Sequence, residues 1–302
     1  MFVSWHPPHN HNDGYQAPGM WHEIYDPDEL SVRQFGRDPS KQERFRDYLS
    51  MVSLLDDHVR KIVEKLESMG VADNTLVVFT SDHGDHFGWI GRNGHKQSPE
   101  DVSVRVPLLM HWPNGLGQFG KSELIVGALD LMPTILGLLD LPVPETCVGK
   151  NLSNAILKGD DDAVDSAPLF LFGPAWRGVY TREFTYSTQN YDYATEANRV
   201  VGGDLGPKSY DTLYDRLQDP WCETNLYDDP AYSQVQADLH ARTLEWLAYF
   251  RDPFVDHSTL VDLLIEPGHS SATNSFFEPA EVTFTQRPID TLHAAGYTEY
   301  VE

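Results

Sequence analysis

The first strong pattern of hydrophobic and polar positions in the chain is helical. Between Lys41 and Met69, apolar residues recur every three or four positions, which is the spacing of one face of an α-helix. Gly70 follows where a helix commonly ends, because glycine adopts the left-handed backbone conformation without strain. The pattern predicts one long amphipathic helix. Its apolar positions are Phe45, Leu49, Val52, Leu55, Val59, Ile62, Leu66 and Met69.

A different pattern follows this predicted helix. Residues 75–80 form a continuous apolar and β-branched run, which is typical of a strand buried on both faces of a parallel sheet. A helix followed by a buried strand indicates an α/β sandwich. Apolar runs at 106–110 and 124–126 predict further strands, and residues 130–139 predict a helix with Pro133 in its first turn.

The pattern changes after an acidic loop at residues 158–166. Beyond it, short aromatic-rich segments bounded by turns predict a small antiparallel sheet, and residues 237–250 have helical spacing. The predicted strands are 168–172, 178–181, 184–187 and 213–215. We therefore expect three parts. They are an α/β domain at residues 1–165, a small C-terminal α+β subdomain at 166–250, and a peripheral tail at 251–302.

The composition of the chain excludes several classes of protein. With 302 residues, of which 40% are hydrophobic, the chain is long enough to bury a substantial core. A formal net charge of -24 disfavours nucleic acid and anionic membranes as partners, so an anionic substrate would need local cations or a metal ion. Cys147 and Cys222 have no spacing typical of a metal site or a disulfide scaffold. No apolar run reaches the length of a transmembrane helix.

The most informative polar segment is Ser81-Asp82-His83-Gly84, which follows directly after the predicted strand at 75–80. Ligands of open parallel sheets gather outside the carboxyl ends of the strands, so these side chains are expected at a site. A carboxylate beside an imidazole can bind one divalent cation. A polar loop in which Asp82 only caps the next element is the alternative interpretation of this segment.

Two other segments carry candidate chemistry. Lys96 lies shortly downstream and could neutralise a bound oxyanion as a point charge. His9 follows two prolines after an apolar start, and a histidine there could bind an anion or protonate a leaving group. Taken singly, a solvent-exposed lysine and a proline-stiffened surface loop explain the two segments better than a functional role does.

In this order and spacing, the three segments resemble the type I sulfatase family of the alkaline phosphatase superfamily. Members carry a Pro-His loop, here Pro8-His9, then a long helix and a strand leading into Ser-Asp-His-Gly, here residues 81–84. The step from Lys96 to Arg105 also fits, although the family's usual Tyr-Glu pair is Glu100-Asp101 here. The resemblance covers roughly residues 2–250. Its C-terminal part rests on Trp176-Arg177-Gly178-Val179, Leu213-Tyr214-Asp215, Asp219-Pro220 and Asn225-Leu226.

The resemblance implies a fold, a reaction and roles for individual residues. The fold would be an alkaline phosphatase-like sandwich with a mostly parallel central sheet, incomplete at its N-terminal side. The reaction would be metal-dependent hydrolysis of a sulfate monoester, on a sulfated small molecule or glycan. Asp82 and His83 would bind a divalent cation, calcium in most sulfatases. Lys96 and His9 would be catalytic and substrate-binding residues, and Arg105 would have a structural role.

One part of the family pattern is missing from these 302 residues. Neither Cys-x-Pro-x-Arg nor Ser-x-Pro-x-Arg occurs, so the residue that becomes the formylglycine nucleophile is absent. We expect the C-terminal portion of a sulfatase, inactive alone and weak in metal binding, because calcium takes six to eight oxygen ligands. His83 in place of an asparagine also suits a phosphate or phosphonate ester hydrolase. A non-catalytic remnant or binding module is a further alternative. A periplasmic or secreted location is expected by family analogy, if a signal peptide lies upstream.

Overall fold

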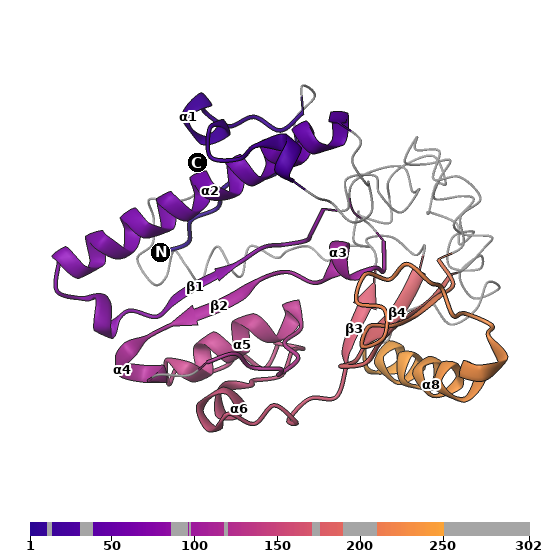
Figure 1. Ribbon diagram of the computed structural model, residues 1–302. Coiled ribbons are helices and arrows are strands. Elements are labelled where there is room, and N and C mark those ends of the chain that lie inside the picture. The colour runs from indigo at the N-terminus through magenta and orange to yellow at the C-terminus, as the bar shows by residue number, and fades with distance from the viewer. Residues whose placement is uncertain are drawn as a thin grey trace, which may run out of the picture.

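The computed structural model describes residues 1–10, 14–30, 39–85, 96, 98–117, 120–170, 176–189 and 210–250. Figure 1 shows a pair of strands between one long helix on one side and a group of shorter helices on the other. The strands are β1 (Val77–Thr80) and β2 (Leu108–His111), and the long helix is α2 (Pro39–Ser68). The shorter helices are α4 (Pro113–Leu116), α5 (Ala128–Leu138) and α6 (Ser153–Lys158). This layered part is the α/β sandwich that the sequence predicts.

The long helix α2 confirms the sequence prediction. It starts two residues before the predicted range, and Gly70 after its end has a φ of 69°, the left-handed conformation that glycine accommodates. Its inner face buries Met51 and Leu55. On its outer face, Asp57 forms ion pairs with Arg60 and Lys61, one helical turn away. The helix is therefore amphipathic, as the spacing of its apolar residues indicates.

The strands β1 and β2 differ from the prediction in direction. They pair antiparallel, with Val77 opposite His111 and Thr80 opposite Leu108, so the parallel pairing expected for β1 is wrong for this neighbour. Burial on both faces is also wrong, since β1 is only partly buried and Leu109 of β2 is 58% exposed. An apolar run indicates that a segment packs against other apolar groups, but it does not specify whether the neighbouring strand is parallel or antiparallel.

The apolar run at 124–126 is not a strand in the structure. Its central residue Ile125 is buried against Leu152, Val164 and Ala167. The run is therefore apolar because it packs into a side-chain cluster, and no ladder of backbone hydrogen bonds is involved. The helix after it, α5, begins two residues before the predicted start. The carboxylate of Asp130 accepts a hydrogen bond from the Gly127 N–H at 3.0 Å and caps that end.

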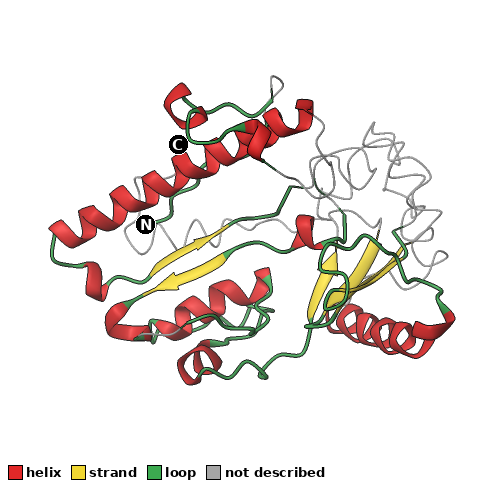
Figure 2. Ribbon diagram, in the orientation of Figure 1, coloured by secondary structure: helices red, strands yellow, loops and turns green. Residues whose placement is uncertain are grey.

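The C-terminal part holds an antiparallel sheet in the order β3-β4-β5-β6, separate from β1 and β2 (Figure 2). Its strands are β3 (Ala167–Phe170), β4 (Trp176–Tyr180), β5 (Phe184–Gln189) and β6 (Thr212–Asp215). Helix α8 (Ser233–Phe250) packs on this sheet and contributes Leu239 to a core with Val179, Tyr186 and Leu213. The small antiparallel sheet and its helix are thus confirmed. The domain boundary at residue 165 stays a prediction, and the expected tail at 251–302 lies outside the described residues.

Short helices connect these parts. They are α1 (Gly19–His22), α3 (Asp101–Val104) and three 3-10 turns at Pro27–Glu29, Ala72–Asn74 and Pro230–Tyr232. Figure 1 shows α3 between the end of the strand pair and the C-terminal sheet. Within the described residues, no helix combines the length and the apolar character needed to cross a membrane.

Candidate active site

The turn after β1 exposes the carboxylate of Asp82. Its side chain is 84% exposed, and its Oδ1 accepts a hydrogen bond from the His83 N–H at 3.0 Å. Partial burial acts to raise the pKa of Asp82, but attraction to the His83 ring and hydrogen bonds from the backbone and Ser81 outweigh it. The pKa therefore lies below its usual range. The turn presents an ionised carboxylate at neutral pH.

Gly84 lets this turn approach helix α3 closely. Its N–H donates to the Ser103 carbonyl at 2.8 Å, and a Cβ atom at Gly84 would lie 2.1 Å from the Val102 carbonyl oxygen. A separation that short is impossible for two non-bonded atoms, so only glycine fits. The backbone of α3 therefore fixes the residue that follows His83.

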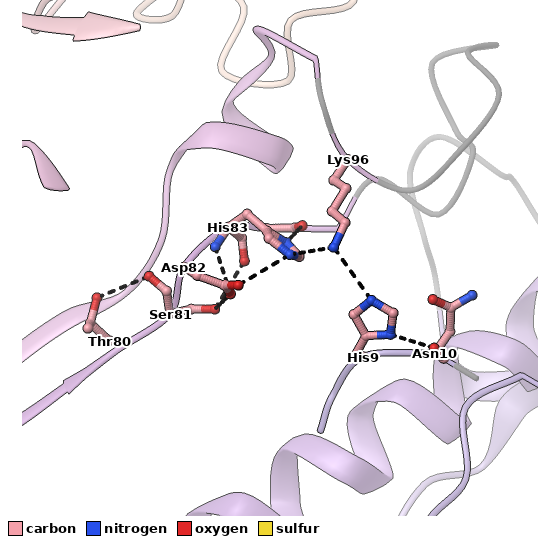
Figure 3. A network of polar contacts seen from close by, with 8 residues as sticks. His9, Asn10, Thr80, Ser81, Asp82, His83 and Lys96 are labelled. Atoms are coloured by element: carbon pink, nitrogen blue, oxygen red, sulfur yellow. Dashed lines mark hydrogen bonds and ion pairs between the residues drawn. The ribbon is translucent and has the colours of Figure 1, made fainter. Parts of the chain in front are cut away.

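Lys96 brings two histidines from distant segments together (Figure 3). Its Nζ lies 2.7 Å from Nε2 of His83 and 3.5 Å from Nε2 of His9. Nε2 of His83 also lies 3.5 Å from Oδ2 of Asp82. All four residues predicted as site residues, His9, Asp82, His83 and Lys96, thus occupy one place in the structure.

The protonation pattern of the two histidines follows from their second ring nitrogens. Nδ1 of His83 lies 2.9 Å from the Gly84 carbonyl oxygen, and Nδ1 of His9 lies 2.5 Å from the Asn10 carbonyl oxygen. A carbonyl can only accept, so each Nδ1 carries a proton, and in the neutral ring Nε2 is an acceptor. Both Nε2 atoms therefore face the Lys96 ammonium as acceptors. The ring of His6 stacks on His9 with centroids 4.8 Å apart and supports its orientation.

The two expected metal ligands form only part of a cation site. Asp82 and His83 supply one carboxylate and one imidazole. The part of the chain that the structure describes holds no group of three or more His, Cys, Asp or Glu side chains able to hold a metal ion. Nε2 of His83 also lies 2.7 Å from the Lys96 ammonium, so this nitrogen already accepts a hydrogen bond. These residues alone do not fit a complete calcium site.

The structure adds a pair that the sequence did not indicate. The buried hydroxyl of Tyr15 donates to the Asp85 carboxylate at 2.6 Å, and Tyr15 lies 70 residues away in sequence. Burial and the neighbouring Asp85 raise the pKa of Tyr15, so the phenol stays protonated and remains a donor. No local spacing could have shown this contact. It attaches the segment before α1 to the turn that carries His83.

Arg105, to which the family resemblance assigns a structural role, is the last candidate from the sequence. Arg105 lies with its Nη1 3.7 Å from Oδ2 of Asp101, one helical turn away, and is largely exposed.

Two family models match the chain. The sulfatase model matches residues 1–141, and the model for the C-terminal region of N-sulphoglucosamine sulphohydrolase matches residues 93–248, just over half of the chain. The chain belongs to the sulfatase family. The resemblance that the sequence motifs indicated is thereby confirmed.

Individual sulfatases match most of the chain. The ulvan-active sulfatase of Formosa agariphila is 27% identical over 252 residues, which are 79% of this chain and 46% of that sulfatase. The putative sulfatase yidJ from Bacteroides fragilis superposes with a TM-score of 0.66 at 26% identity, over 82% of this chain and 53% of the other. These comparisons confirm an alkaline phosphatase-like α/β fold.

A third match comes from a study of glycosaminoglycan metabolism in Bacteroides thetaiotaomicron. That structure superposes with a TM-score of 0.70 at 25% identity, over 86% of this chain and 56% of the other. This chain therefore spans about half the length of the sulfatases it matches.

Proposed function

We propose that this chain contributes the anion-binding part of a sulfuric ester hydrolase site. The observation that carries the proposal is the position of Lys96 Nζ between Nε2 of His83 and Nε2 of His9. Three basic side chains converge there from three separate segments, in a chain with a formal net charge of -24. An ammonium beside two imidazoles that can each take up a proton favours a bound oxyanion in spite of the negative charge of the whole chain.

Each residue of the site has a role in this proposal. Lys96 binds a sulfate oxygen and stabilises negative charge that develops on the leaving oxygen. His9, when protonated, donates from Nε2 to that leaving oxygen as a general acid, while its Nδ1 remains bound to the Asn10 carbonyl. By family resemblance, Asp82 would supply one ligand to a divalent cation, calcium in most sulfatases, and His83 a second once its Nε2 leaves Lys96; a cation held there would neutralise charge on the sulfate.

The matched sulfatases support a class of substrate. One is named an ulvan-active sulfatase, and another was described in a study of the metabolism of glycosaminoglycans. We propose that the whole protein acts on a sulfated glycan, and the chemistry of the site requires only the sulfate group itself.

A binding measurement tests the proposal without a nucleophile. We expect 4-nitrophenyl sulfate to shift the side-chain NMR signals of His9 and His83, and the same shifts in a Lys96→Ala variant to need roughly ten to a hundred times more ligand. Absence of any shift in the parent chain would overturn the proposal. If a matched phosphonate monoester binds more tightly than the sulfate, the site is instead suited to phosphonate ester hydrolysis.

Hydrolysis is a separate measurement. Because neither sequence motif for the formylglycine residue occurs in these 302 residues, we expect no turnover of 4-nitrophenyl sulfate by this chain alone. Turnover should appear when the chain is joined to the N-terminal portion of a related sulfatase that carries Cys-x-Pro-x-Arg. Turnover by the chain alone would show that the nucleophile is a residue outside that motif.

A further inference from the structure

Ser103 holds both sides of the candidate active site. Its carbonyl oxygen accepts from the N–H of Gly84, next to His83, at 2.8 Å. Its Oγ lies 3.4 Å from the N–H of Ser98, two residues after Lys96, in a long contact. Ser103 belongs to α3, a helix of four residues. Any movement of this short helix would therefore change the position of His83 relative to Lys96.

Helix α3 is fixed to the C-terminal sheet by the acidic residue that precedes it. Glu100 occupies the N-cap position and is only 2% exposed. Its Oε1 accepts a hydrogen bond from the hydroxyl of Tyr214 at 3.1 Å, and Tyr214 lies in β6, 114 residues away in sequence. A hydrogen bond to a carboxylate is stronger than one between neutral groups, which suits a contact that must fix a helix of one turn.

The next residue makes a second connection to the same sheet. Oδ1 of Asp101 lies 3.6 Å from Nε of Arg216 and 3.3 Å from Oγ1 of Thr185 in β5. Arg216 is 7% exposed, and its Nη1 donates to the hydroxyl of Tyr180 in β4 at 2.6 Å. Burial raises the pKa of Asp101 and Arg216 opposes that shift, so the pair holds a charge that burial disfavours.

Stability alone does not account for two acidic side chains at this position. Buried charges cost desolvation energy, and apolar replacements of a buried ion pair are often as stable or more so. The geometry offers a different reason. Glu100 accepts a directed hydrogen bond from Tyr214, and Asp101 lies between Arg216 and Thr185, whereas apolar packing alone would not fix a helix of one turn to that accuracy.

We propose that Glu100 and Asp101 are positioning residues, which fix α3 to the C-terminal sheet and so hold His83 and Lys96 in their observed relation. Through this connection the C-terminal sheet determines the geometry of the site. None of the described residues of that sheet is itself one of the four site residues. The effect on sulfate binding rests on the proposed function, whereas the effect on the position of Gly84 does not.

The Gly84 amide provides a direct test, because its single backbone hydrogen bond ends on Ser103. In a Tyr214→Phe variant, which loses only the hydroxyl, we expect Gly84 to exchange its amide hydrogen about tenfold faster, as for loss of one hydrogen bond to a charged group. The matched control is Tyr249→Phe on α8, which loses a hydroxyl bound to the Val148 carbonyl at 2.9 Å. This control should leave Gly84 unchanged.

A conservative variant separates positioning from general stability. Glu100→Gln keeps an oxygen that accepts from Tyr214, so we expect near-parental exchange at Gly84, whereas Glu100→Ala should accelerate it. Equal acceleration in the Tyr249→Phe control, or a uniform increase across all amides of Tyr214→Phe, would overturn the proposal.

Failure of the proposed function would be recognised separately. Sulfate would then bind neither the parent chain nor any variant, while the effect on Gly84 exchange would persist. If both proposals hold, Tyr214→Phe should also weaken the binding of 4-nitrophenyl sulfate by about the same factor of ten, and Glu100→Gln should leave that binding near the parental value.

Discussion

Nζ of Lys96 lies 2.7 Å from Nε2 of His83 but 3.5 Å from Nε2 of His9. The first distance is a strong hydrogen bond and the second a weak one. An oxyanion oxygen that enters between Lys96 and His9 would therefore replace the weaker contact and leave the stronger one intact. The ammonium would keep one fixed acceptor, His83, while it binds the anion.

The first prediction concerns the contribution of Lys96 to anion binding. Lys96→Ala removes a cation that contacts both histidines. A hydrogen bond to a charged group contributes about 1.5–3 kcal/mol, so sulfate affinity should fall by roughly tenfold to a hundredfold. Isothermal titration calorimetry with sodium sulfate at low ionic strength measures this change.

The matched control for Lys96 is Lys158→Ala. Lys158 lies in the last turn of α6, with an exposed side chain, and belongs to a different layer of the fold. The Lys158→Ala substitution removes the same charge from the chain as Lys96→Ala does, and it should leave sulfate affinity unchanged. Equal losses in the two variants would mean that net charge, and not the site, determines binding.

The second prediction concerns calcium. One carboxylate and one imidazole fall far short of the six to eight oxygens that calcium prefers, so we expect a Kd of about 1 mM or weaker for this chain. At 1 mM calcium the stabilisation would then be about 0.4 kcal/mol, a small increase in Tm that EGTA abolishes. Differential scanning fluorimetry measures this shift, and Asp82→Ala should remove it. A shift that saturates at micromolar calcium would contradict the prediction.

Local patterns explain which elements the sequence could predict. Helix α2, helix α8 and the C-terminal strands follow from spacing within one segment, and the structure confirms them. The direction of β1 relative to β2 and the state of residues 124–126 do not follow from such spacing. The strand direction and the state of residues 124–126 both depend on which distant groups the apolar side chains contact. The residues of one segment alone do not contain that information.

The site shows the same division. The ordered motifs placed His9, Asp82, His83 and Lys96 in one site, and their side chains lie together in the structure. The supporting contacts were not predictable. The pair of Tyr15 with Asp85 spans 70 residues and the pair of Glu100 with Tyr214 spans 114, with no local spacing that relates the partners. Such contacts follow from packing in three dimensions, which no spacing along the sequence records.

The third prediction concerns the close approach at Gly84. A Cβ atom there would lie 2.1 Å from the backbone oxygen of Val102, which cannot move away as a flexible side chain could. Gly84→Ala should therefore destabilise the chain by about 1–3 kcal/mol, the usual range for overpacking. Urea denaturation measures the change. Gly120→Ala is the control, because a Cβ atom at Gly120 meets nothing within 4 Å, and a similar loss there would contradict the explanation.

The fourth prediction concerns the two cysteines. Burial raises the pKa of Cys222 to about 12, and the side chain is 4% exposed, whereas Cys147 is partly exposed. At pH 8 a thiol of pKa 12 is ionised in about one molecule in ten thousand, and the thiolate is the reactive form. Iodoacetamide should therefore label Cys147 and leave Cys222 unmodified in the folded chain, and both should react in urea. Mass spectrometry of the peptides identifies the labelled residue.

Cys222 also gives the chain a predicted dependence on alkaline pH. The unfolded thiol ionises near its ordinary pKa of 9.0, while the folded thiol stays protonated to about pH 12. Between these values the unfolded state binds fewer protons, so stability falls as pH rises, by up to about 1.4 kcal/mol per pH unit. Cys222→Ala removes this term, so its Tm should fall less than that of the parent chain between pH 8 and 11. Parallel curves for the two proteins would show that the buried tyrosines, not Cys222, cause the alkaline loss.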